Sequence, residues 1–180
     1  MKEVIIFSAI IPCLNPQDSK LLELIQSIRA QDFPQSQIEI LVISEGDSES
    51  AKAIGIRRAK GKICVMLCAD NYFCEPTLFS QVYKKMKFYG AVYERHYAYL
   101  KKDNSLNRYF SLIGGNDPLS YYMGKNDKDD YISERNWDVF PSVGDNGFFI
   151  DREVLLGSDL ENDYHVDNIY DVRTQVRLTT

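Results

Sequence analysis

The chain has 180 residues, of which 44% are hydrophobic and 26% are charged, and its formal net charge is −5. This length favours one domain that buries a hydrophobic core of its own. The acidic balance argues against a general nucleic-acid-binding protein, because such a protein needs a basic field to neutralise phosphates.

The cysteines Cys13, Cys64, Cys68 and Cys74 show no CxxC spacing, and no histidine lies near them to complete a zinc site. We therefore expect reduced, mostly buried thiols in a cytoplasmic protein. The first apolar run, 4–11, is too short to cross a bilayer, and we expect no signal peptide.

The stretch 4–89 alternates predicted strands with predicted helices. Apolar runs bounded by turn residues predict strands at 4–11, 38–44 and 63–67. Apolar residues at helical spacing predict helices from Asp18 or Ser19 to Pro34, at 50–60 and at 75–89.

This alternation predicts an α/β fold with a Rossmann-like, mostly parallel sheet flanked by helices on both faces. The loops that follow the strands should gather at one edge of the sheet, where such folds bind ligands. These loops are 12–15, 45–48 and 68–71.

The helical and strand periodicity weakens after Gly90. We predict a strand at 91–100, a helix at 105–113, a turn-rich polar stretch at 116–131, a short strand at 148–150, and a short helix from Asp151 to near Gly157. An acid-rich stretch, 159–167, precedes a closing helix at 168–176.

Asp70 stands where the third predicted strand ends, and its carboxylate is a natural ligand for a hard divalent cation. The alternative is that Asp70 only caps the helix that follows. The first loop, 12–15, has neither a Gly-x-Gly-x-x-Gly fingerprint nor a P-loop. Carboxylates at this edge would reach a phosphate only through a bridging metal, so a metal-bridged diphosphate is the expected ligand.

A basic cluster, Lys84, Lys85 and Lys87, lies on the third predicted helix. A solvated helix face is the favoured interpretation. The alternative is contact with a phosphate or with an anionic membrane surface, which would make the protein a peripheral membrane protein.

Several segments match one enzyme family in order and spacing. They are Ser8-Ala-Ile-Ile-Pro-Cys-Leu-Asn15, Ile25 to Pro34, Ile38 to Ser48, Ala51 to Gly61, Leu67-Cys-Ala-Asp-Asn71 with Pro76, and Gly147 to Val154. Together they resemble the inverting glycosyltransferases of family 2, which have the GT-A fold. The resemblance is strong over 1–90 and weak over 144–170.

The resemblance implies a single glycosyltransferase-like domain over 1–180, with a nucleotide-binding half at 1–90 and a sugar and acceptor half at 91–180. Family members usually continue further, so the second half is expected to be either truncated or minimal. The nucleotide-binding residues implied are Pro12, Leu14, Asn15, Glu45, which would accept a hydrogen bond from the base, Asp47, Lys52 and Asp70.

Asp70 matches the last acid of the family's Asp-x-Asp element, which holds Mn²⁺ or Mg²⁺ on the donor diphosphate, and Cys68 replaces its first acid. The resemblance further implies sugar and acceptor contacts from Asn71, Asp145, Asn146 and Gly147. The best match for the general base is Asp167, with Asp163 second.

The implied reaction is metal-dependent, inverting transfer of a sugar from a UDP- or GDP-type donor to a hydroxyl of a glycan or lipid-linked glycan. A non-catalytic sugar-nucleotide-binding module of a larger protein is the alternative. A nucleotidyltransferase is a weaker one, because the glycine-rich first loop that its chemistry favours is absent.

Overall fold

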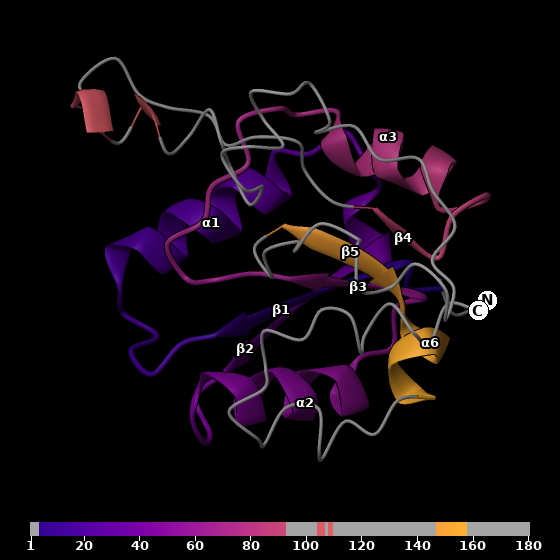
Figure 1. Ribbon diagram of the computed structural model, residues 1–180, viewed down its shortest axis with the longest axis horizontal. Helices are drawn as coiled ribbons and strands as arrows, with labels where there is room; N and C mark the ends of the chain where they lie inside the picture. Colours follow the sequence, from indigo (N-terminus) through magenta and orange to yellow (C-terminus); the bar gives the residue numbers. More distant parts are fainter. Residues whose placement is uncertain (1–3, 93–103, 107, 110–146, 158–180) are drawn as a thin grey trace.

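In the computed structural model of the protein, which describes residues 4–92, 104–106, 108–109 and 147–157, a five-stranded sheet carries helices on both faces (Figure 1). This arrangement confirms the predicted α/β fold with a mostly parallel sheet. The strands are β1 (Phe7–Pro12), β2 (Ile38–Ile43), β3 (Ile63–Met66), β4 (Ala91–Val92) and β5 (Phe148–Asp151). The helices are α1 (Ser19–Arg29), a 3₁₀ turn (Gln35–Gln37), α2 (Ser48–Arg58), α3 (Leu78–Lys85) and α6 (Arg152–Leu156).

The strands follow the order β2-β1-β3-β5-β4. β1 is parallel to β2 and β3, whereas β5 is antiparallel to both β3 and β4. Pro12 pairs with Ile43, and Ile10 pairs with Met66, so the parallel strands end at the same edge of the sheet. The chain leaves β1 for β2 on one side and then crosses to β3 on the other. The topological switch point, where open α/β sheets bind ligands, therefore lies between β1 and β3.

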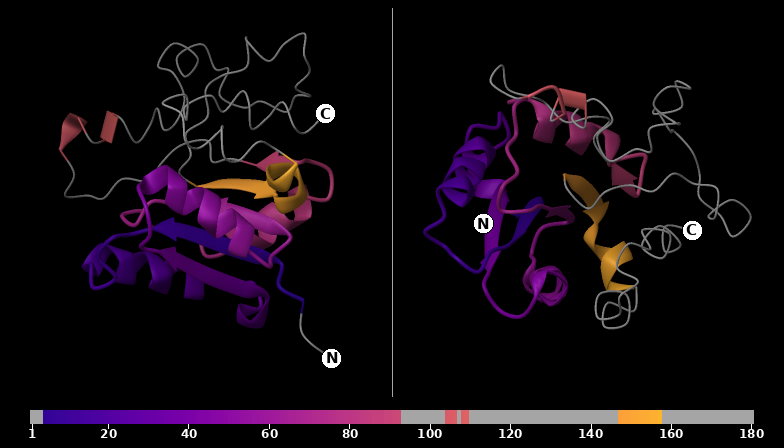
Figure 2. Two further views of the ribbon diagram at one scale, coloured as in Figure 1. Left: turned by 90° about the horizontal axis from the view of Figure 1, so that it is seen from below. Right: turned by 60° about the vertical axis from the view of Figure 1, so that its left-hand side comes forward.

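Successive residues of β1 enter two separate cores, as the alternation of side chains in a strand requires. Phe7, Ala9 and Ile11 pack with α1 and α3, whereas Ile10 packs with α2 and α6. Figure 1 shows these helix pairs on opposite faces, and the turned views show the orange β5–α6 unit beside β3 and α2 (Figure 2). A sheet covered on both faces explains why its strands read as continuous apolar runs.

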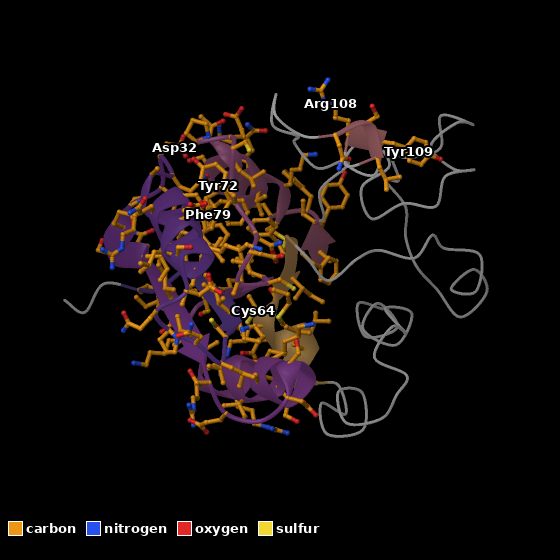
Figure 3. All side chains as sticks on the ribbon, turned by 90° about the vertical axis from the view of Figure 1, so that its left-hand side faces the viewer. Asp32, Cys64, Tyr72, Phe79, Arg108 and Tyr109 are labelled. Carbon is orange, nitrogen blue, oxygen red and sulfur yellow. The ribbon has the colours of Figure 1, made fainter. Side chains whose placement is uncertain are left out.

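An aromatic cluster fills the core between the sheet and the helices α1 and α3. The ring centroids of Phe7 and Phe79 are 4.8 Å apart, and those of Phe79 and Phe149 are 5.6 Å apart at 87°. Figure 3 shows Phe79 inside the protein, with Cys64 on the other side of the sheet. Each edge-to-face pair adds about 1 kcal/mol beyond the burial of its area. This cluster joins α3 to β1 and β5, which are far apart in the sequence.

Several element boundaries differ from their predictions. The first helix, α1, ends at Arg29 rather than at Pro34, and β1 and α3 differ for physical reasons. Val4 is 71% exposed, and β1 starts only at Phe7, where pairing with both β2 and β3 begins. The predicted helix at 75–89 is shorter, Leu78–Lys85, because Thr77 is its N-cap and a turn at 86–88 ends it. Of the strand predicted at 91–100, only β4 falls within the described residues.

Glu39 is an acid that the fold uses for its own stability. Its carboxylate accepts hydrogen bonds from the Ser8 hydroxyl and from the backbone N–H groups of Lys60 and Gly61. These residues lie at the edge where β1 and β3 begin, opposite the candidate site. A Cβ at position 61 would lie 2.6 Å from the backbone carbon of Phe7, so only glycine fits there.

None of the four cysteines forms a disulfide, and only Cys64 is fully buried. Cys74 is exposed, so the prediction of mostly buried thiols is wrong for that residue. Cys13 and Cys68 are half-buried.

We expect the stability of the protein to fall above about pH 9 because of Cys64. Burial raises the pKa of this thiol from 9.0 to about 12, and the Arg152 charge opposes the rise only in part. Below the unfolded pKa both states hold the proton. Between the two pKa values only the folded state keeps it, so the free energy of unfolding falls as pH rises, by up to about 1.4 kcal/mol per pH unit.

Urea denaturation of the wild type and of Cys64→Ala, below and above about pH 9, measures this loss of stability. The variant lacks the titrating thiol, so the stability difference between the two proteins should shrink as pH rises. A difference that stays constant with pH would contradict the prediction.

Candidate functional site

The loops predicted to bind the nucleotide lie at the carboxyl edge of the parallel strands. The N–H of Cys13 donates to Ile43 O over 2.9 Å, and that of Leu67 donates to Ile10 O over 3.1 Å. Through these bonds the pairing of the strands continues up to the start of the loops 12–15 and 68–71. The two loops therefore flank the switch point between β1 and β3.

Asp70 lies in a turn that other groups hold in place. The side-chain oxygen of Asn71 accepts from the N–H of Cys68 over 2.7 Å, and the N–H of Asn71 donates to Cys68 O over 3.0 Å. Asp70 itself is exposed. The alternative that Asp70 caps the next helix is wrong, because α3 has Thr77 at its N-cap.

The residues around Asp70 suit a cation that arrives with a ligand rather than a preformed metal centre. In the described part of the chain, no group of three or more His, Cys, Asp or Glu side chains could hold a metal ion. Asp70 is the only acid of its turn, and Cys68 is half-buried beside it. Mg²⁺ and Mn²⁺ commonly take one or two protein carboxylates and fill their other positions with substrate phosphates and water. A single exposed carboxylate fits that chemistry.

The loop 12–15 is shaped by its own hydrogen bonds. The side-chain oxygen of Asn15 accepts from the N–H of Gln17 over 3.2 Å, and its backbone oxygen accepts from the N–H of Asp18 over 3.0 Å. Asp18 then caps α1 through a 2.9 Å bond from the N–H of Lys20. Pro12 is half-buried at the end of β1, and Leu14 is 80% exposed.

Tyr72 is a residue at this edge that the sequence reasoning did not single out. It follows the Asp70 turn and is 60% exposed. Leu14 and Tyr72 thus offer apolar surface on the loops that flank the switch point. An aromatic ring and an aliphatic side chain can contact the face of a base or a sugar. The only signal in the sequence is that Tyr72 lies two residues after Asp70.

Glu45 is bound by a residue that the sequence reasoning left out of the site. Both carboxylate oxygens of Glu45 accept from the guanidinium of Arg58, each over 3.0 Å. The two side chains are more than half exposed, so the pair contributes little stability. Its effect is to orient Glu45. Nothing in the local sequence pairs Glu45 with a residue at the far end of the next helix.

Two other predicted nucleotide-binding residues belong to α2. Asp47 is the N-cap of α2 and accepts from the N–H of Ser50 over 2.8 Å. Lys52 lies in the first half of α2 and is only 2% exposed. Asp47 therefore has a structural function whether or not it contacts a ligand.

The predicted sugar and acceptor residues lie mostly outside the described residues. Gly147 is described: its φ is 73°, a conformation that favours glycine, and its N–H donates to Met66 O over 2.9 Å. This bond places the start of β5 at the carboxyl end of β3. Asp145, Asn146, Asp163 and Asp167 are not among the described residues. Their assignment, including the general base, stays a prediction.

Two buried polar residues, Ser27 in α1 and Gln31 just after its end, fix the segment that follows the Asp70 turn. The Ser27 hydroxyl accepts from the N–H of Phe73 over 3.1 Å. Gln31 donates to Glu75 O over 3.0 Å, and its side-chain oxygen accepts from the N–H of Phe79 over 3.2 Å. A signal for them exists in the sequence, because Ser27 falls on the apolar stripe of α1 with Leu24 and Ile28, and Gln31 continues the same spacing past the end of the helix.

No known family model and no curated protein matches the sequence. Solved structures with a similar fold include three crystal structures of residues 1–349 of S. aureus TarS, a glycosyltransferase. The TM-score is 0.60 for TarS 1–349 at 13% identity, 0.58 for its complex with UDP at 14%, and 0.57 for its complex with UDP-GlcNAc at 13%. They match 97%, 97% and 95% of this chain, which spans about half of their length (55%, 54% and 53%). The chain therefore has an α/β fold of the kind found in the glycosyltransferase TarS.

Proposed function

We propose that the protein is the catalytic domain of a metal-dependent, inverting glycosyltransferase of the family 2 type that uses a UDP-sugar donor. The observation that carries the proposal is the position of Asp70, an exposed carboxylate at the switch point of this fold. The likeness to TarS, whose structures include complexes with UDP and UDP-GlcNAc, supports a UDP-type donor.

In this proposal the loops 12–15 and 68–71 hold the two ends of the donor nucleotide. Pro12, Leu14 and Asn15 contact the nucleoside, and Glu45 accepts a hydrogen bond from the base. A carboxylate has about four lone-pair sites, so Glu45 can bind Arg58 and still accept from a base. Arg58 then serves to keep Glu45 in one orientation.

Asp70 would hold Mn²⁺ or Mg²⁺ against the donor diphosphate. When bound, the cation supplies positive charge that stabilises the diphosphate as a leaving group. The proposed general base, Asp167 or else Asp163, removes the proton of the acceptor hydroxyl as its oxygen attacks the anomeric carbon. The new bond forms on the face opposite the breaking bond, so the nucleoside diphosphate leaves and the anomeric centre inverts. A glycan or lipid-linked glycan is the proposed acceptor.

The metal-dependent part of nucleotide binding should require Asp70. We expect UDP and UDP-GlcNAc to raise the melting temperature more with Mn²⁺ than without it. A ligand at a hundred times its Kd stabilises a protein by about 2.7 kcal/mol. In Asp70→Asn the increment from Mn²⁺ should disappear, while a large excess of uridine should still shift the melt.

Differential scanning fluorimetry with UDP, UDP-GlcNAc, GDP and uridine, with and without Mn²⁺, tests this expectation. Glu23→Gln is the matched control, because it removes one exposed carboxylate from the middle of α1, away from the loops of the site. If no nucleotide shifts the melt under either condition, the proposed function is wrong.

A non-catalytic sugar-nucleotide-binding module is the second candidate. Cys68 favours it, because this thiol stands in place of the first acid of the Asp-x-Asp element and suits a hard cation poorly. The two candidates differ in turnover rather than in binding. Release of UDP from UDP-GlcNAc in the presence of a panel of glycan acceptors would support the enzyme. Metal-assisted UDP binding without any release would support the module.

A further inference from the structure

The end of α3 carries a basic and aromatic surface that the proposed function does not use. Lys84, Lys85 and Lys87 are exposed, and Phe88 beside them is 83% exposed. We call these four residues the α3 terminal surface. The backbone bonds from Met86 N to Val82 O (2.8 Å) and from Phe88 N to Lys85 O (2.9 Å) hold the segment in a fixed turn.

This surface lies at the edge of the sheet opposite the candidate site. Gly90, just beyond it, accepts from the N–H of Asp151 over 2.9 Å. Asp151 pairs with Ile63 at the start of β3, whereas the candidate site lies where β3 ends. The exposed Lys60 and Lys62 precede β3 and so belong to the same edge.

The charge here is a local feature, because the whole chain has a net charge of −5. Basic residues also suit the negative end of a helix dipole, which accounts for Lys84 and Lys85 in the last turn of α3. The dipole does not account for the exposure of Phe88, whose ring lies in solvent next to the lysines in the sequence. A single exposed aromatic residue is ordinary, but an exposed ring within a lysine cluster is the composition of surfaces that enter the headgroup region of a bilayer.

We propose that the α3 terminal surface binds the surface of an anionic lipid bilayer. The lysines would contact the lipid phosphates, and Phe88 would enter the boundary between headgroups and acyl chains. A soluble polyanion would also attract the lysines but offers no apolar layer for the ring. In the described part of the chain, no helix is long and apolar enough to cross a membrane.

Such an attachment leaves the opposite edge of the sheet in water. The loops 12–15 and 68–71 would then face away from the lipid and stay open to a soluble donor. Because only a few lysines and one ring contribute, the binding should be reversible and weak, and salt should reverse it.

Co-sedimentation of the full 180-residue chain with vesicles tests the proposal. We expect binding to phosphatidylcholine vesicles only when about a quarter of the lipid is phosphatidylglycerol, at low ionic strength and about millimolar lipid. Lys84→Gln and Lys85→Gln should each lower the partition coefficient by about fivefold. Phe88→Ala should lower it by about tenfold.

Two control variants test whether the loss of binding is specific to this surface, rather than common to any loss of a positive charge or of an exposed apolar side chain. Lys20→Gln makes the same charge change at the start of α1, near the candidate site, and Leu22→Ala removes an exposed apolar side chain from α1. Neither should change the partition coefficient, and circular dichroism should show all variants folded. Equal binding to neutral vesicles, equal effects of Lys20→Gln and Lys84→Gln, or binding to heparin without binding to vesicles would each overturn the proposal.

Discussion

Asp70→Asn is expected to lower the rate of sugar transfer by about a hundredfold to a thousandfold while the protein stays folded. The substitution keeps the shape of the side chain and removes its charge. The turn around Asp70 is closed by Asn71 and Cys68, so it does not depend on the Asp70 carboxylate. The loss should therefore fall on catalysis and on metal-assisted donor binding rather than on stability.

The measurement is the rate of UDP release from UDP-GlcNAc, with water as the acceptor where no sugar acceptor is supplied. Glu23→Gln should keep the wild-type rate, because α1 presents Glu23 to solvent at mid-helix. The melting temperature of Asp70→Asn should stay within about 2 °C of the wild type, as for most exposed substitutions. Wild-type turnover in Asp70→Asn would show that Asp70 is not part of the site and would leave the metal without a carboxylate in the turn after β3.

Much of the sheet and its ligand edge was predictable, because both follow from burial and connectivity. The apolar runs that became β1, β2 and β3 are continuous since both faces of the sheet are covered, and each ends in a polar loop. Parallel strands joined by helices must present those loops at one edge. The position of Asp70 therefore follows from the sequence pattern.

The insertion of β5 between β3 and β4 was not predictable in the same way. The run Phe148-Phe-Ile150 predicts a strand, but its pattern contains no information about its neighbours or its direction. Pairing between residues so distant in the sequence depends on the rest of the sheet. The hydrogen bonds between Glu45 and Arg58 could not be predicted for the same reason. A polar pair on the surface has no periodic spacing that would reveal it in the sequence.

Gln31 was missed for a related reason: besides the nearby Ser27 carbonyl, its side chain bonds backbone groups of a segment more than forty residues away. A polar residue that continues the apolar spacing of α1 past its end indicates only that some partner must exist. Which segment supplies the partner depends on where the chain runs after β3.

Gln31→Leu is expected to lower the free energy of unfolding by about 2 kcal/mol. Leucine is similar in volume and suits a buried position just after the end of α1. It would, however, leave the buried N–H of Phe79 without the partner that the Gln31 side-chain oxygen provides. A buried polar group left without a partner costs about 1–3 kcal/mol. The carbonyl of Glu75 also loses the Gln31 amide, but it still accepts from the N–H of Leu78 over 3.4 Å. In a domain of this size the loss corresponds to a melting temperature lower by about 6 °C.

Urea denaturation of Gln31→Leu beside Gln35→Leu measures the effect. Gln35 is exposed and its amide reaches only nearby carbonyls, at 3.3 Å from Phe33 O and 3.5 Å from Gln31 O. Gln35→Leu should therefore change the stability by less than about 0.5 kcal/mol. Equal stability of the two variants would show that the bonds of Gln31 are replaced by water. A loss confined to Gln31→Leu would show that the buried residue just after α1 fixes the segment that follows Asp70, so that the core of the fold also positions the edge of the site.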